Sequence, residues 1–164
     1  MATVTKNLSE IDYASLPKAR GKKITLVVAQ WNKEITQGLQ DGAMETLYKL
    51  GVYNRDIKVV EVPGSFELPF AAKQVVQNNS VDAVICIGSV IKGETSHFDY
   101  VCQGTAYGIQ RLNVTGDTPV IFCVLTDDTI QQSKDRSGGK HGNKGVEAAA
   151  AAVQMIKVKE DLAQ

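Results

Sequence analysis

The sequence lacks any long apolar run. No stretch approaches the roughly 20 consecutive apolar residues that a membrane-spanning helix needs, which argues against a helical membrane protein. The first 21 residues have neither the apolar centre of a secretory signal nor the arginine- and serine-rich composition of a transit peptide. We therefore expect the protein to work in the cytoplasm.

The chain also lacks an excess of charge of either sign. Lysine and arginine together number 18, as do aspartate and glutamate, so the formal net charge is zero. Proteins that bind a nucleic-acid backbone or an anionic membrane surface usually carry a basic excess. We expect neither nucleic acid nor membrane among the partners.

Cysteine is scarce, and Cys86, Cys102 and Cys123 are odd in number, widely spaced and set among apolar residues. Disulfide frameworks and cysteine-based metal sites need paired or closely spaced cysteines. We predict small buried thiols and no metal site.

Two nucleotide-binding motifs are absent. The Gly-x4-Gly-Lys-[Ser/Thr] pattern of a P-loop does not occur, and no Gly-x-Gly-x-x-Gly pattern follows the first apolar run. These absences argue against a P-loop nucleotide hydrolase and against a dinucleotide-dependent enzyme, and we expect no cofactor.

The sequence does contain a regular alternation of apolar runs and helical patterns. Its 164 residues fit one domain with a sizeable core. Residues 1–22 are polar and aperiodic, and we interpret them as an arm that stays off the core of an α/β domain over residues 23–164. Short apolar runs predict strands at 24–29, 57–62, 83–87 and 120–125. Helical spacing, with Asn32 as an N-cap and Gly51 after the C-terminus of the first helix, predicts helices at about 33–50, 67–77, 97–113, 128–136 and 144–161.

Strands that alternate with helices predict a parallel sheet, because parallel neighbours need a crossover connection. Right-handed crossovers place helices on both faces of the sheet. We predict an α/β fold, namely a three-layer α/β/α sandwich of the flavodoxin-like kind with a four-stranded parallel sheet. The N-terminal arm is a candidate for a further strand, in the same subunit or in a neighbour.

Ligands of open parallel sheets bind outside the carboxyl ends of the strands. Four loops are predicted there, at residues 30–32, 63–67, 88–97 and 126–128. Trp31, the only tryptophan, is placed to stack on a planar heterocycle or to pack over the edge of the sheet. The residues alone leave these two alternatives equal.

The loop at residues 63–67 opens a helix. Ser65 and the backbone N–H groups suit a polyol or an anion, and the Glu67 carboxylate can accept hydrogen bonds from hydroxyl groups. From the residues alone, a plain Pro-Gly turn with Ser65 as N-cap is the stronger alternative.

The loop at residues 88–97 is punctuated by glycine and rich in hydrogen-bond donors. The backbone of Gly93 and Glu94 and the hydroxyl of Thr95 suit a phosphate. Histidine is the side chain best suited to exchange protons near neutral pH, which makes His97 the natural proton carrier. A structural histidine beside a helix start is the commoner case.

Residues 134–145 hold four basic side chains, one acidic side chain and four glycines before a helix. Cationic side chains and the positive end of a helix favour an anion. Composition leaves a phosphate site and a solvated basic loop equally open.

Together the four strand-end loops predict a pocket for one aromatic ring, one polyol and one phosphate.

Four segments together resemble the signature of the 6,7-dimethyl-8-ribityllumazine synthase family: Gln30-Trp31-Asn32, Pro63-Gly64-Ser65-Phe66-Glu67, residues 93–99 and residues 136–145. They occur in the order and spacing of that family, and the resemblance runs from about Lys23 to the C-terminus. It implies condensation of 5-amino-6-(D-ribitylamino)uracil with 3,4-dihydroxy-2-butanone 4-phosphate, the penultimate step of riboflavin biosynthesis. Phosphate and water are lost, and no metal or redox cofactor is used.

The resemblance also implies a role for each site residue. His97 would shuttle protons, Arg136 would clamp the phosphate and Trp31 would stack on the pyrimidine. The other residues would bind the substrates. The ribityl chain would contact Gly64, Ser65, Phe66 and Glu67, and the pyrimidine would contact Ser89, Val90, Ile91 and Lys144. The phosphate would contact Gly93, Glu94 and Thr95, with Lys140 nearby, and Phe122 would reach in from a neighbouring subunit.

Three positions depart from the family pattern without removing a needed group. Trp31 stands where Phe is more common, Cys123 where Gly is usual and Ser137 where Ala is frequent.

By resemblance we expect a homopentamer with sites at subunit interfaces, and the short 138–145 loop permits assembly into an icosahedral shell. The alternatives are a flavin- or riboflavin-binding protein without catalysis, which would leave His97 and Arg136 idle, and a shell-forming scaffold with a decayed site, against which the intact motifs argue.

Overall fold

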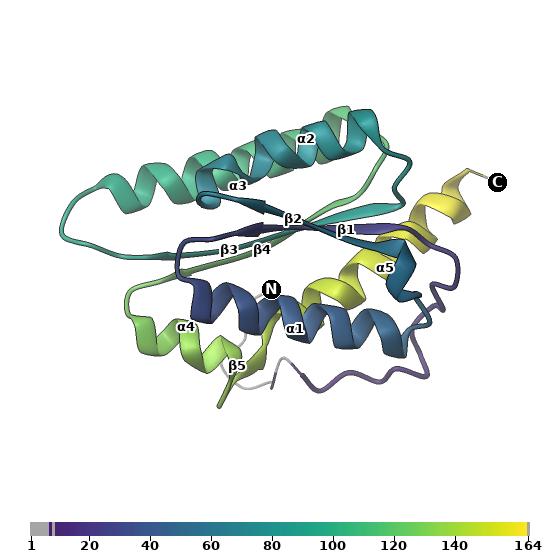
Figure 1. The fold of residues 1–164 in the computed structure, drawn as a ribbon, viewed down its shortest axis with the longest axis horizontal. Coiled ribbons are helices and arrows are strands. Elements are labelled where there is room, and N and C mark those ends of the chain that lie inside the picture. The colour runs from purple at the N-terminus through teal and green to yellow at the C-terminus, as the bar shows by residue number, and fades with distance from the viewer. Residues whose placement is uncertain (1–6, 8, 164) are drawn as a thin grey trace.

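The computed structural model describes residue 7 and residues 9–163. Its centre is a four-stranded parallel sheet in the order β2-β1-β3-β4. The strands are β1 (Ile24–Ala29), β2 (Ile57–Val62), β3 (Ala83–Ile91) and β4 (Val120–Asp127). One face is covered by α1 (Lys33–Lys49), α4 (Ile130–Arg136) and α5 (Lys144–Leu162), and the other by α2 (Leu68–Asn78) and α3 (His97–Thr115), as Figure 1 shows. The predicted three-layer α/β/α sandwich is confirmed.

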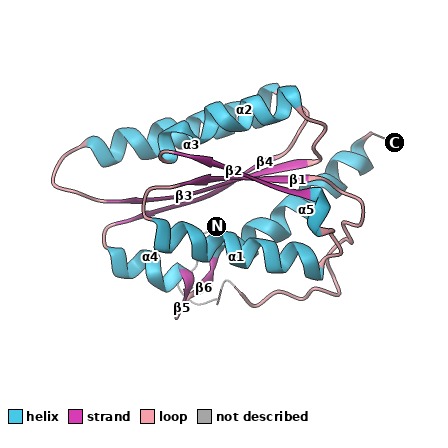
Figure 2. Cartoon of the chain, in the orientation of Figure 1, coloured by secondary structure: helices cyan, strands magenta, loops and turns pink. Residues whose placement is uncertain are grey.

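Strands β3 and β4 are longer than the strands that we predicted from the apolar runs. They stay paired from Val84 and Val120 up to the pair formed by Ile91 and Asp127, so the end of β3 lies in the sheet and not in a loop. A second sheet was not predicted at all. The strands β5 (Ser137–Gly139) and β6 (Gly142–Asn143) form a short antiparallel hairpin within the basic segment, between α4 and α5 (Figure 2).

The two central strands β1 and β3 are buried on both faces, which explains why they are almost entirely apolar. On β3, Ile85 and Ile87 pack toward α1 and α5, whereas Val84 and Cys86 pack toward α2 and α3. Each fully buried leucine or isoleucine stabilises the fold by about 1.5–3 kcal/mol relative to an exposed one. Four alanines of α5, namely Ala148, Ala149, Ala150 and Ala152, are buried in the core cluster that α1 also joins, and their small side chains let these two helices approach closely.

The N-terminus of α1 is not capped in the predicted way. Asn32 occupies the N-cap position but makes no capping hydrogen bond with its side chain, and its φ of 58° lies in the left-handed region that asparagine tolerates. The side-chain amide instead donates to the Ser89 carbonyl, 3.0 Å away on β3. The other end follows the prediction, because Gly51 follows the helix with a φ of +94° and donates to the Tyr48 carbonyl.

The prediction that residues 1–22 stay off the core is wrong for part of the arm. Leu16 and Ala19 are buried in the core cluster on the α1–α5 side, and Ile11 and Tyr13 pack against it. These apolar residues follow no helical or strand period, which is why the sequence pattern did not reveal them. Residues 9–22 form no strand, and the arm's residues 1–6 and 8 lie outside the described residues.

Two of the three cysteines are the buried thiols that we predicted. Cys86 and Cys123 are inaccessible, and burial raises the pKa of both thiols, to about 12 for Cys123. Cys102 on α3 is only half-buried, so the prediction fails there. In the part of the chain that the structure describes, no three histidine, cysteine or acidic side chains are grouped to hold a metal ion. No helix in those residues has the length and apolar character needed to cross a bilayer.

Candidate active site

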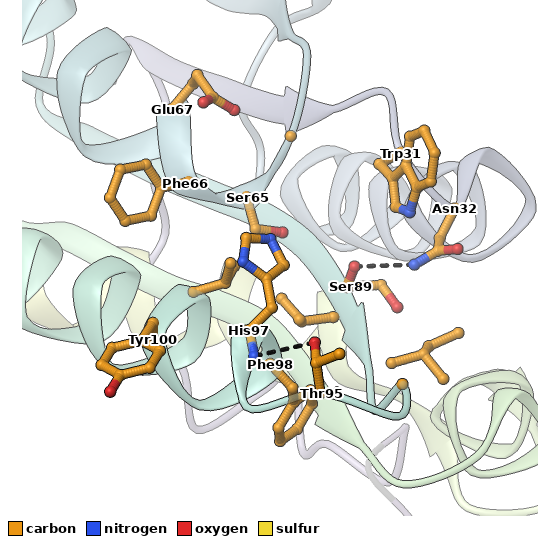
Figure 3. Close-up of a pocket in the computed structure, with 15 residues that line it drawn as sticks. Trp31, Asn32, Ser65, Phe66, Glu67, Ser89, Thr95, His97, Phe98 and Tyr100 are labelled. Atoms are coloured by element: carbon orange, nitrogen blue, oxygen red, sulfur yellow. Dashed lines mark hydrogen bonds between the residues drawn. The ribbon is translucent and has the colours of Figure 1, made fainter.

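A cavity of about 650 Å³ opens at the carboxyl ends of the strands. It lies where the strand order reverses between β1 and β3, the usual ligand position in open parallel sheets. Figure 3 shows side chains from separate segments pointing into it. Eleven residues that we predicted for the site line this cavity: Trp31, Gly64, Ser65, Phe66, Glu67, Ser89, Val90, Ile91, Gly93, Thr95 and His97.

The first wall of the cavity carries Trp31, which lies at the rim immediately after β1. Its side chain is 73% exposed, so the indole does not pack over the sheet edge and its faces are accessible to a planar ligand. The backbone beneath it is fixed, since the N–H groups of Gln30 and Trp31 donate to the carbonyls of Val62 and Pro63 at 2.8 and 3.2 Å. Of the two alternatives that the sequence left open, the structure has the exposed ring.

The second wall comes from the 3₁₀ turn η2 (Ser65–Glu67), which precedes α2. Ser65 is not the N-cap of a helix as the plain-turn alternative requires, because Gly64 occupies the cap of η2 and Glu67 that of α2. The Glu67 side chain is exposed and lines the cavity. The turn is therefore free to use its carboxylate on a ligand.

The turn η2 is held rigidly from two sides. The Thr105 hydroxyl on α3 donates to the Ser65 carbonyl at 3.1 Å, and both residues are buried. Gly104 lets the Phe66 ring lie against α3, since a Cβ there would stand 2.7 Å from the ring. A Cβ on Gly88 would stand 2.5 Å from the Ser65 Oγ. Two glycines on facing elements thus make room for one turn.

The end of β3 forms the floor of the cavity. Val90 and Ile91 are half-buried and supply an apolar surface. The side-chain oxygens of Ser65 and Ser89 are buried and have no hydrogen-bond partner among the residues that the structure describes. Buried hydroxyls normally find a partner, so these two remain available to a polar ligand after a rotation about χ1.

The third wall is the segment that leads into α3. A Cβ on Gly93 would meet nothing within 4 Å, so a ligand can approach the backbone closely. The Thr95 hydroxyl accepts from the His97 backbone N–H at 3.4 Å, and the exposed His97 imidazole lines the cavity (Figure 3). The 19-residue helix α3 begins at His97, so its positive end points toward this wall.

Five predicted site residues do not line the cavity of this chain: Glu94, Phe122, Arg136, Lys140 and Lys144. Phe122 lies within the edge strand β4 and is 37% exposed. Arg136 ends α4 and Lys144 begins α5, in the layer on the other face of the sheet from η2 and α3 (Figure 1).

Ion pairs order much of the basic segment. Lys140 approaches Asp135 at 3.3 Å, and Lys144 pairs with Glu147 at 2.7 Å. Hydrogen bonds from Gln131 and from Lys140 lower the pKa of Asp135. Arg136 makes no ion pair within the described residues.

Four cavity residues were missing from our predicted site: Asn32, Phe98, Tyr100 and Val101. The last three lie at the start of α3, within four residues of His97. Helical spacing could have revealed Tyr100, because residues three apart share a face of a helix. Its side chain is 72% exposed, which is unusual for a tyrosine that only packs.

Comparison with known proteins gives a consistent result. The sequence model of the family described as 6,7-dimethyl-8-ribityllumazine synthase matches residues 21–160. A protein of that name from Flavobacterium johnsoniae is 54% identical over 160 residues, which cover 98% of this chain and 84% of the relative. Proteins of the same name from Parabacteroides distasonis and Christiangramia forsetii are 53% and 50% identical, covering 95% and 98% of this chain and 98% and 96% of their own lengths.

Proposed function

Because the chain belongs to the 6,7-dimethyl-8-ribityllumazine synthase family, we propose that its cavity condenses 5-amino-6-(D-ribitylamino)uracil with 3,4-dihydroxy-2-butanone 4-phosphate. The products are 6,7-dimethyl-8-ribityllumazine, phosphate and water. The observation that carries the proposal is one cavity lined by an exposed indole, a carboxylate and a histidine from three separate segments.

The ring and the sugar-alcohol chain of the first substrate fit two walls of the cavity. Trp31 offers a face for stacking on the pyrimidine, with Val90 and Ile91 as the apolar floor. Glu67 accepts hydrogen bonds from the ribityl hydroxyls, and Gly64 leaves room for this carboxylate, since a Cβ there would stand 3.1 Å from Glu67 Oε2. Ser65 adds a donor when its hydroxyl rotates toward the ligand.

The phosphate-bearing substrate fits the third wall. The open backbone at Gly93, the Thr95 hydroxyl and the positive end of α3 suit a phosphate, and the Glu94 backbone lies between them. The carbon–oxygen bond to the phosphate breaks as phosphate is eliminated, and two carbon–nitrogen bonds form as two water molecules are lost. The reaction is redox-neutral overall. His97 takes a proton from the attacking amine and returns it to a leaving oxygen, and its position in the lining of the cavity supports this role.

Much of the rate enhancement in such a condensation comes from holding the amine near the ketone. Orientation of two reactants can supply roughly 7–11 kcal/mol, whereas proton transfer by a positioned side chain contributes about 100- to 10,000-fold in rate. The rigid walls described above suit that demand. The flavin-binding alternative is not favoured, because it gives no task to His97 and the relatives are named as synthases.

We also propose that a neighbouring copy completes the cavity. Phe122, Arg136, Lys140 and Lys144 do not line the cavity of their own chain, and in a ring they would reach the cavity of the adjacent subunit. The α2–α3 face supports such a contact, since it exposes Phe70, Tyr107 and Val114 by 69, 68 and 74%. We propose a homopentamer in the cytoplasm, and the short 138–145 loop permits its further assembly into an icosahedral shell.

The direct test mixes both substrates with the purified protein and follows the absorbance of the lumazine product. Product should form with both substrates and not with either one alone, and no added metal should be needed. Lack of product from folded protein would contradict the proposed function. Light scattering tests the assembly separately, and a mass near that of one 17.7 kDa chain would contradict the ring.

A further inference from the structure

One buried amide connects the basic segment to helix α1. The Asn143 side chain donates from Nδ2 to the Gly38 carbonyl on α1 at 2.7 Å and to the Ser137 carbonyl at 3.3 Å. Its Oδ1 accepts from the Gly145 N–H at 2.8 Å. Asn143 is 9% exposed, so every polar atom of this side chain is used within the fold.

The bonded neighbours matter for the proposed site. Ser137 directly follows Arg136, and Gly145 directly follows Lys144. A single side chain therefore ties the backbone beside both of these cations to one rigid helix. The β5–β6 hairpin reinforces this connection, because Ser137 on β5 pairs with Asn143 on β6.

Helix α1 is shaped to receive this contact. A Cβ on Gly42 would stand 2.5 Å from Asn143 Nδ2, and a Cβ on Gly38 would stand 2.6 Å from the Ser137 carbonyl oxygen. Glycine in a helix interior costs about 0.5–1 kcal/mol relative to alanine. Two such glycines, one turn apart on α1, face the basic segment, so the helix gives up stability where the segment lies against it.

We infer that Asn143 is a positioning residue that fixes Arg136 at the place where the phosphate of the substrate binds. The inference rests on the proposed function and adds to it a residue outside the cavity. Four glycines lie among residues 138–145, and a segment so rich in glycine loses much conformational entropy when it is ordered. The Asn143 hydrogen bonds offset that loss before substrate arrives, so the cost does not weaken binding.

Arg136 depends on this anchor more than Lys144 does. Lys144 has a second constraint, its ion pair with Glu147 on the same helix. Arg136 has no ion pair within the described residues. Loosening the anchor should thus weaken phosphate binding more than binding of the pyrimidine substrate.

The test compares three variants by steady-state kinetics and by inhibition with inorganic phosphate. Asn143→Asp keeps an acceptor for Gly145 and removes both donors. Gly42→Ala keeps every hydrogen-bonding group and displaces the amide. Asn113→Asp is the matched control, because Asn113 also donates to two carbonyls and accepts from one N–H. It lies at the C-terminal end of α3 beside the start of β4, at the opposite end of the strands from the cavity.

We expect Asn143→Asp and Gly42→Ala to raise the KM for the butanone phosphate and the inhibition constant of inorganic phosphate by about tenfold, since a misplacement of about 1 Å can cost up to about 100-fold. The KM for the ribitylaminouracil should change by less than about threefold by the same argument. Asn113→Asp should lower the melting temperature and leave the three constants unchanged.

Unchanged phosphate constants in Gly42→Ala and in folded Asn143→Asp would overturn the inference, as would the same kinetic change in Asn113→Asp. If Asn143→Asp does not fold, Gly42→Ala decides. A wild-type protein that forms no lumazine would instead overturn the proposed function, so the two failures are distinguishable.

Discussion

Asn32 donates a hydrogen bond from its side-chain amide to the backbone carbonyl of Ser89, 3.0 Å away and 57 positions later in the chain. The bond joins the loop that carries Trp31 to the end of β3, which is the floor of the cavity. Asn32 has a φ of 58°, and no other residue except glycine has a positive φ within the described part of the chain. One hydrogen bond thus joins the Trp31 loop to the floor of the site.

Replacing Asn32 by glycine should separate backbone conformation from hydrogen bonding. Glycine adopts the positive φ without strain but cannot bond to Ser89, so we expect a loss of about 1 kcal/mol in the free energy of unfolding. The KM for the ribitylaminouracil should rise by about tenfold, which corresponds to about 1.4 kcal/mol of binding. Urea unfolding and steady-state kinetics measure the two effects. A variant with wild-type KM would show that the bond serves stability alone.

Trp31 should report directly on the occupied site. It is the only tryptophan and is 73% exposed, so the intrinsic tryptophan emission of the protein comes from the cavity rim. Stacking of a planar ring on the indole should quench that emission and shift it to shorter wavelength as water leaves the ring. Fluorescence titration with the lumazine product checks this.

The matched control for that titration is a phosphate compound without a ring, which should leave the emission unchanged. Trp31→Phe should keep a stacking surface and retain activity, while losing the signal. Emission that does not respond to the product at saturating concentration would remove Trp31 from the ring site.

Substitutions of His97 and of Arg136 should change the steady-state kinetics in different ways. His97→Ala should lower kcat by about 100-fold without abolishing product formation, because orientation of the reactants is retained. Arg136→Ala should reduce kcat/KM for the butanone phosphate more strongly, because it removes the charged partner of the leaving phosphate. Parallel kinetics on both variants, with Lys18→Ala in the arm as a surface control, checks the prediction. An inactive His97→Ala beside a normal Arg136→Ala would reverse the assignment.

Stability should fall at alkaline pH because of the buried thiols. Burial raises the pKa of Cys123 from 9.0 to about 12, so the folded state retains a proton that the unfolded chain releases above pH 9. The contribution is complete below pH 9 and is lost as pH rises toward 12, by about 1.4 kcal/mol per pH unit for one thiol. Urea unfolding at pH 8, 9.5 and 10.5 measures this decline.

Cys123→Ala is the comparison for the pH series. It creates a small cavity and lowers stability at every pH, but its stability should decline less steeply than that of the wild type above pH 9. The lysines also titrate in this range, so only the difference between the two slopes counts. Equal slopes would show that the thiol does not contribute.

The sequence predicted the strands and helices well because their signals are local. Apolar runs over six residues and helical spacing over a few turns depend on near neighbours, and the β1 and β2 ranges match the structure. The sequence also placed eleven site residues at one end of the sheet, since the carboxyl ends of parallel strands meet at one edge.

Long-range contacts were beyond the sequence pattern. The packing of Leu16 and Ala19 on the core and the β5–β6 hairpin have no periodic signal. The separation of Arg136 and Phe122 from the cavity of their own chain also depends on long-range arrangement. Arg136 is placed by the face of the sheet that α4 covers, and Phe122 by the position of β4 at the edge of the sheet. Residues far apart in the chain meet only after the crossovers have set that arrangement.

The sequence by itself determined the α/β class, the order of the elements and the chemical kinds of group available to the site, because these follow from the local composition of short segments. Only the tertiary structure decided that Asn32 bonds to Ser89 and that Asn143 lies against glycines of α1. The physical reason is that a hydrogen bond or a close contact requires ångström-scale positions, and in a parallel sheet those positions are set jointly by every strand and helix that packs around it.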